Sequence, residues 1–167
     1  VFHVNYLGGD MPTFALNFSR PGAQVAAQYY SFLRLGVEGY TRVQQYSRNV
    51  ATSLADRIAA LGPFRLLTRG DQLPVFAFTL ADGETGFSVF DVSAALRERG
   101  WLVPAYTFPA HREDLAVLRV VVRAGFTHDL ADLLVEDLAR SLPALRAQDR
   151  PRHGAGSAAF SHGAEPR

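Results

Sequence analysis

The stretch Phe64–Gly100, FRLLTRGDQLPVFAFTLADGETGFSVFDVSAALRERG, carries the pattern that decides the fold. Residues 64–68 and 74–80 are apolar runs, and the second alternates larger and smaller side chains with the period of two expected of a strand. A loop rich in turn residues follows, and residues 90–99 predict a helix that ends at Gly100. The stretch therefore predicts two strands followed by a helix.

Beyond this stretch the pattern repeats. Residues 102–106 and 116–122 predict two more strands, and residues 130–145 predict an amphipathic helix with Asp129 as its N-terminal cap. We expect the buried side of this helix to comprise Leu130, Leu133, Leu134, Leu138 and Leu142. Residues 63–147 thus predict a small α/β domain, a ββαββα layer with its helices on one face of the sheet.

Upstream of this layer, residues 1–12 have the glycines and proline of a loop, and residues 13–18 form a short apolar strand candidate. A helix is expected to begin near Pro21, because the fixed φ of proline suits a first helical position. Its apolar face continues to residue 61, with a break indicated at residues 36–39 by two glycines.

We therefore expect four parts. Residues 1–20 would form a loop and strand, residues 21–62 a long helix, residues 63–147 the α/β layer and residues 148–167 a flexible tail. A helix this long exceeds what the layer can cover, which favours contact with another domain or a partner subunit.

Composition excludes several classes of protein. The formal net charge of the 167 residues is only +1, which disfavours a nucleic-acid binder, although all 17 basic residues are arginine. Without lysine, no side chain of this chain can form an internal Schiff base with an aldehyde cofactor. Without cysteine there is no disulfide or thiolate metal site, and the histidines show no metal-ligand spacing.

Neither a membrane span nor a signal peptide is evident, so we expect a soluble, cytoplasmic protein. The chain begins with Val1, from which we expect that the start of the gene product is missing.

Two polar positions stand out. Ser19, followed by Arg20, lies just before the predicted helix, where a hydroxyl can either bind a phosphate or cap the helix. Arg119 lies among the valines of a predicted strand, where a guanidinium needs a partner. On the residues alone, Arg119 is either an edge or ion-paired structural arginine, or it binds a carboxylate ligand.

Three ordered stretches, NYLGGDMPTFALNFSRPGAQVAAQYYSFLRLGVEGY, RERGWLVPAYTFP and VLRVVVRAGF, resemble the C-terminal portion of bacterial glutamate decarboxylase, a pyridoxal-phosphate enzyme of the group II decarboxylases. The resemblance runs along nearly the whole chain but covers only about the last third of the family's length. It implies the aspartate-aminotransferase fold (fold type I), in which a long helix links a large cofactor domain to a small C-terminal α/β domain. It also implies a homo-oligomer, with active sites at the subunit interface.

The resemblance implies pyridoxal 5'-phosphate as cofactor and the conversion of L-glutamate to 4-aminobutyrate and CO2. The Schiff-base lysine of the family would lie upstream, so we expect no catalytic residue in this chain and no activity of the chain alone. By resemblance, Arg119 would hold a substrate carboxylate and Ser19 would reach the cofactor phosphate across the dimer. Tyr6 and Leu7 would belong to a loop that closes over a neighbouring active site.

His162 aligns with a near-terminal histidine that folds into the site as a pH-sensitive plug in some bacterial members, the alternative being an inert tail. Arg123 is expected to be structural, and no metal is implied.

A rival hypothesis is a non-catalytic α/β binding or oligomerisation module that pairs through its long helix. An arginine-rich nucleic-acid binder is a weaker one, because acidic residues nearly balance the arginines.

Overall fold

The computed structural model describes residues 2–6, 9–13, 21–84, 86–109 and 111–147. Along the chain, the elements are β1 (Phe2–Tyr6), β2 (Gly9–Thr13), α1 (Ala23–Ala60), β3 (Phe64–Leu66), β4 (Val75–Leu80), α2 (Val89–Glu98), β5 (Ala105–Thr107), β6 (Ala116–Val121) and α3 (His128–Arg146). From β3 onward this is the ββαββα order expected from the sequence, and it confirms the α/β class.

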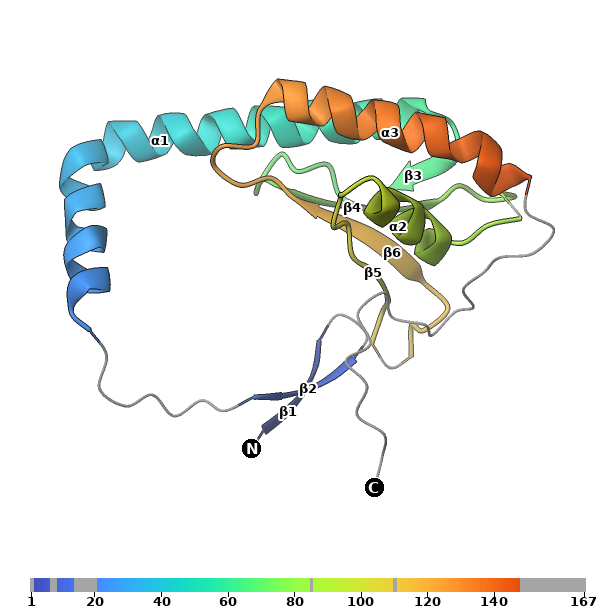
Figure 1. Ribbon diagram of the computed structural model, residues 1–167, viewed down its shortest axis with the longest axis horizontal. Helices are drawn as coiled ribbons and strands as arrows, with labels where there is room; N and C mark the ends of the chain where they lie inside the picture. The colour runs from blue at the N-terminus through green and yellow to red at the C-terminus, as the bar shows by residue number, and fades with distance from the viewer. Residues whose placement is uncertain (1, 7–8, 14–20, 85, 110, 148–167) are drawn as a thin grey trace.

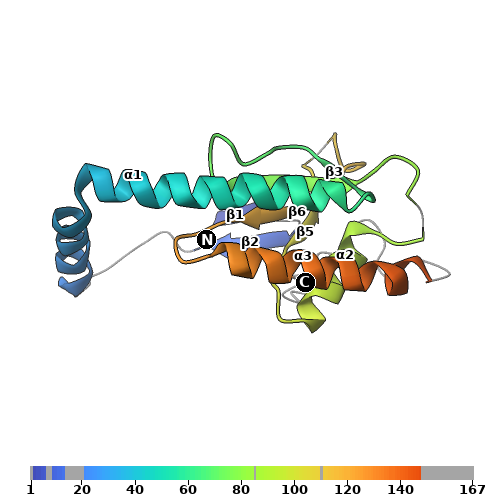
Figure 2. The same ribbon diagram turned by 90° about the horizontal axis from the view of Figure 1, so that it is seen from above.

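The four later strands form one antiparallel sheet in the order β3-β4-β6-β5. Helices α1 and α3 lie side by side over one face of this sheet, as Figures 1 and 2 show together, and α2 packs against β5, β6 and α3. The face beneath the helices carries the phenylalanines of β4 and, in β6, the residues on either side of Arg119. The core therefore includes Phe76 and Phe78 of β4 and Leu118 and Val120 of β6.

Helix α1 enters the core only with its second half. Val50, Leu54 and Ile58, spaced four residues apart, are fully buried against the sheet and α3. Arg57 of α1 also donates a hydrogen bond to Asp132 of α3, and the ring of Tyr46 contacts that of His128 edge-on. The first half of α1 extends away from this core.

The bend in α1 has a single residue at its centre. Gly36 has φ 57° and ψ −172°, and the helix changes direction at this point. This conformation is strained for any residue with a side chain, so glycine is what permits the bend. It lies within residues 36–39, where the sequence indicates a break. The part of the helix before it, residues 23–35, is called the arm below.

Two expectations for α3 are wrong. Its N-cap is Thr127, whose hydroxyl accepts a hydrogen bond from the Leu130 backbone N–H, and Asp129 lies inside the first turn. Leu130 and Leu133 are exposed rather than buried. The buried stripe of the helix is Ala131, Leu134, Leu138, Leu142 and Leu145. At 100° per residue, Leu130 and Leu133 lie on one flank of this stripe, which explains their exposure.

The expectation of a loop over residues 1–12 is also wrong. β1 and β2 form an antiparallel pair in which Phe2 is opposite Thr13 and Tyr6 is opposite Gly9. The strand expected at residues 13–18 lies, apart from Thr13 at the end of β2, outside the described residues.

Candidate functional site

Arg119 lies on the sheet face that the helices leave uncovered. It is opposite Ala77 of β4, and its neighbours two positions away along β6, Val117 and Val121, share its face. Opposite Val117, on the edge strand β5, lies Tyr106. A long cationic side chain thus stands on an otherwise apolar part of this sheet face, as the sequence pattern predicts.

The surroundings of Arg119 hold both its backbone and its side chain. Its N–H donates to the carbonyl oxygen of Pro104, at 3.2 Å, which continues the β5–β6 pairing by one residue. The central carbon of its guanidinium lies 5.7 Å from the centre of the Tyr106 ring, within the range of a cation–π interaction. Arg119 is half-buried, so part of the residue remains accessible to a ligand.

Arg123 differs from Arg119 in position and exposure. It follows the end of β6 and is exposed, and its carbonyl oxygen accepts a hydrogen bond from the N–H of Phe126 in the turn before α3. Arg123 carries the same charge as Arg119 but lies beyond the end of β6, so a substitution of Arg123 is a matched control for one of Arg119.

The other residues singled out from the sequence are not brought to Arg119 by the described part of the chain. Ser19, Leu7 and His162 lie outside the described residues. Tyr6 is the last residue of β1, where it pairs with Gly9. Their predicted roles remain predictions.

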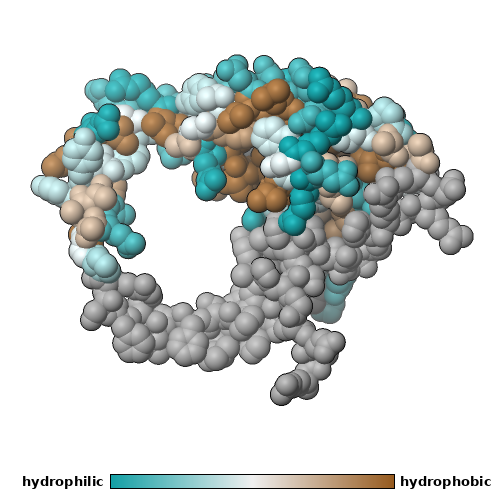
Figure 3. Space-filling model, in the orientation of Figure 1, coloured by the Kyte–Doolittle hydropathy of each residue, from teal (hydrophilic) through white to brown (hydrophobic). Residues whose placement is uncertain are grey.

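The arm carries a second surface, which sequence reasoning anticipated only as a helix too long for its domain. Val25, Tyr29 and Leu33 recur every fourth residue and Phe32 flanks them, so these side chains form one apolar stripe. The stripe is exposed among the described residues, with 65% of Tyr29 and 68% of Leu33 accessible. Figure 3 shows apolar residues on the surface of the arm.

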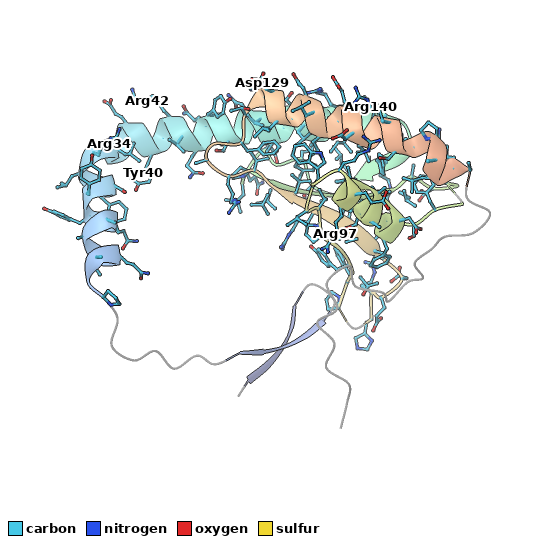
Figure 4. All side chains as sticks on the ribbon, in the orientation of Figure 1. Arg34, Tyr40, Arg42, Arg97, Asp129 and Arg140 are labelled. Atoms are coloured by element: carbon cyan, nitrogen blue, oxygen red, sulfur yellow. The ribbon has the colours of Figure 1, made fainter. Side chains whose placement is uncertain are left out.

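At the bend, the two halves of α1 and the loop before β4 line an open groove of about 770 Å³. Its apolar wall is made by Phe32, Val37, Tyr40, Leu73 and Pro74. The rings of Phe32 and Tyr40 are in contact, with centroids 5.8 Å apart. Figure 4 shows Tyr40 on the inner side of the bend and Arg42 on the outer side. The arm and groove together form an exposed apolar surface, a feature that marks interaction sites on proteins.

Several other charged groups have structural partners. Asp137 of α3 accepts hydrogen bonds from the Trp101 indole, at 2.9 Å, and from Arg99, at 3.0 Å. The Trp101 hydrogen bond is the largest cause that lowers the pKa of Asp137 below its usual 3.8, and the nearby charge of Arg99 acts in the same direction. Ser88 and buried Asp91 form a capping box at the start of α2.

The described residues contain no cluster of three histidine or acidic side chains arranged to bind a metal ion. Among the same residues, no helix has the combination of length and apolar character needed to cross a bilayer.

Comparison with known proteins gives the class. Residues 1–81 match the model of the pyridoxal-dependent decarboxylase conserved domain. Glutamate decarboxylase of Lactobacillus brevis superposes with a TM-score of 0.75 at 38% identity, over 87% of this chain and 33% of that structure. Sphingosine-1-phosphate lyase of Burkholderia pseudomallei, at 24% identity and a TM-score of 0.62, shares the fold. Over residues 1–81 the chain is thus similar to the pyridoxal-dependent decarboxylases, and the solved structures that it resembles have the fold-type-I architecture.

The particular relatives are more specific. Glutamate decarboxylase of Aliivibrio fischeri is 47% identical over 168 residues, which cover 98% of this chain and 36% of that protein. Glutamate decarboxylase of Solanum lycopersicum is 47% identical over 148 residues, 89% of this chain and 29% of that protein. The chain thus spans about a third of the length of these curated relatives.

Proposed function

We propose that this chain forms the C-terminal part of a cytoplasmic glutamate decarboxylase, which converts L-glutamate to 4-aminobutyrate and CO2. The observation that carries the proposal is Arg119, a half-buried arginine on the mostly apolar sheet face that the helices do not cover. The 47% identity to a glutamate decarboxylase over nearly the whole chain supports the choice of reaction.

Arg119 would hold a carboxylate of the substrate. A guanidinium presents paired N–H donors that match the two oxygens of a carboxylate, and such a bidentate contact fixes orientation as well as position. On a sheet face flanked by valines and a tyrosine ring, this contact gains strength because little water competes for it. Arg119 would thereby orient the substrate so that the bond to be broken is presented to the cofactor.

This chain would supply a part of the pyridoxal-phosphate site. Ser19 would hold the phosphate of a neighbouring subunit's cofactor, and a lysine outside these 167 residues would attach the cofactor covalently, because the chain contains none. When bound, pyridoxal phosphate supplies an electron sink for the loss of CO2. Tyr6 and Leu7 would exclude water from the site by closing over it. His162 would enter the site as a pH-sensitive plug.

A homo-oligomer is part of this proposal. The apolar stripe of the arm has one charged residue near it, Arg34, and helices of this kind are stable when their apolar face is covered. We assign the cover to a second copy of the protein. The arm directly follows Ser19 and Arg20 in sequence, so pairing through the arm would bring this turn close to the neighbouring subunit. Residues 1–20 and 21–62 would then serve the shared site and its link to the domain at 63–147.

The experiment is a chimera. The aligned C-terminal region of Aliivibrio fischeri glutamate decarboxylase is replaced by this chain, and CO2 release from L-glutamate is measured with added pyridoxal phosphate. We expect the chimera to be active and the 167-residue chain alone to be inactive. A soluble, cofactor-loaded chimera without activity would favour the non-catalytic module instead. Activity of the chain alone would overturn the assignment of the covalent attachment to another segment.

A further inference from the structure

We propose that Tyr106 is a positioning residue that fixes the guanidinium of Arg119 on the sheet face that the helices do not cover. The consequence of this role, tighter binding of a carboxylate, rests on the proposed function. The contact between the Tyr106 ring and the Arg119 guanidinium does not, because both residues belong to this chain. The inference is carried by the strand register, by the ring-to-cation distance and by the place of Tyr106 on β5, at one end of the strand order.

The register makes Tyr106 and Arg119 diagonal neighbours. Tyr106 is directly opposite Val117 in the β5–β6 pair, and Arg119 is two residues further along β6 on the same face. Diagonal pairs lie about 7–8 Å apart, and somewhat less at Cβ, which aromatic rings and long side chains can span. The guanidinium carbon indeed lies 5.7 Å from the ring centre. The contact is therefore built into the sheet and needs no loop to form it.

The strand that carries Tyr106 explains why an aromatic ring is useful here. β5 is three residues long and lies at the edge of the sheet, next to β6 and to no further strand in that sheet. A large side chain at position 106 limits the rotamers open to the Arg119 side chain, and arginine carries about 2 kcal/mol of rotamer entropy. A ring against the cation removes much of this freedom before a ligand arrives.

A cation–π contact differs from an ion pair in the groups that it uses. The ring is attracted to the positive charge of the guanidinium and supplies no oxygen acceptor for its N–H groups. An acidic partner in the same place would accept those hydrogen bonds and compete with a substrate carboxylate. Tyr106 thus orients the cation through the face of its ring, and this contact does not itself use an N–H group of Arg119.

The test uses the 167-residue chain and the side-chain NMR signals of Arg119, assigned by their loss in Arg119→Lys. In the wild type we expect cross-relaxation between the Tyr106 ring protons and the Arg119 side chain, together with a ring-current shift of the Arg119 signals. Tyr106→Phe keeps the ring and should keep the shift, whereas Tyr106→Leu should abolish it. Tyr29→Leu, which removes an exposed arm tyrosine, is the matched control and should leave the Arg119 signals unchanged.

Glutarate then serves as a probe dicarboxylate. Its dissociation constant, followed by the Arg119 Nε–Hε signal, should rise about two- to fivefold in Tyr106→Leu and stay unchanged in Tyr106→Phe. Absence of both cross-relaxation and ring-current shift in the wild type would overturn the positioning role, and this holds even if the leucine variant fails to fold. An equal glutarate affinity in the phenylalanine and leucine variants would overturn it too. A third outcome separates the two claims. If the Arg119 signals depend on the ring but glutarate changes them in no variant, the Tyr106–Arg119 contact is upheld and the carboxylate role of Arg119 is overturned.

Discussion

Replacing Gly36 by alanine should straighten α1, and the structure allows the competing energies to be compared. A Cβ at this position would meet no heavy atom within 4 Å, so steric overlap does not decide the outcome. Keeping the bend would hold alanine at φ 57° and ψ −172°, a conformation that costs about 1–3 kcal/mol for a residue with a side chain. Straightening would instead lose the Phe32–Tyr40 ring contact, worth about 0.5–1.5 kcal/mol. It would also gain about 1 kcal/mol, because alanine is the better helix former. Straightening therefore costs less.

The assay is a distance measurement by pulsed electron paramagnetic resonance, which the absence of native cysteines makes simple. Spin labels on Gln28→Cys and Arg42→Cys flank the bend, 14 residues apart. In a straight helix the two Cα atoms would be about 21 Å apart, at 1.5 Å per residue. We expect the Gly36→Ala distance to lengthen toward this value. Gly22→Ala, at an ordinary φ of −71°, is the control and should change nothing. An unchanged distance in Gly36→Ala would refute the energy comparison.

Three further predictions concern the α/β domain. Leu138→Ala should lower the free energy of unfolding by about 2–5 kcal/mol, because Leu138 is fully buried. Leu133→Ala, at an exposed position, should change it by less than about 0.5 kcal/mol. Urea denaturation of both variants tests the buried stripe of α3, and similar losses in the two would contradict it. Thr127→Ala should cost about 0.5–2 kcal/mol in the same assay, and more than Asp129→Asn, which removes only a charge near the helix N-terminus; the reverse order would contradict Thr127 as the cap. Asp137→Asn should destabilise the chain near neutral pH, and progressively less as the pH falls below 3.8. The pKa of Asp137 is lower in the folded state than its usual 3.8, so its stabilisation is complete above that value and is lost as the pH falls through the folded-state pKa. A difference between wild type and variant that does not shrink in acid would contradict this.

The layer of strands and helices could be predicted from the sequence because its signals are local. β4 alternates bulky and smaller residues, and α2 is bounded by Ser88 and Gly100. The errors have local causes as well. Leu130 and Leu133 are leucines on an exposed flank, where leucine still favours the helix although it is not buried.

The hairpin at the start of the chain could not be read from composition. β2 contains Gly9, Asp10 and Pro12, three residue types that are depleted in strands, and its pairing with β1 outweighs these preferences.

The candidate site was partly predictable. Arg119 stands out because a charge interrupts a valine-rich strand, and this signal is visible in one short stretch. The role proposed for Tyr106 depends on the register between β5 and β6, which are separated by a loop and whose pairing is a tertiary property. The apolar stripe of the arm has the spacing of a core helix, and only its exposure distinguishes it from one.

The central claim is that Arg119 serves the carboxylate of a decarboxylase substrate. It is tested most directly by kcat/KM for L-glutamate in the chimera, with Arg119→Gln compared with Arg123→Gln. We expect Arg119→Gln to lower kcat/KM about ten- to a hundredfold, the loss expected for hydrogen bonds to a charged group, and Arg123→Gln to stay near the unsubstituted chimera. Equal values for the two variants, both folded and loaded with cofactor, would contradict the account.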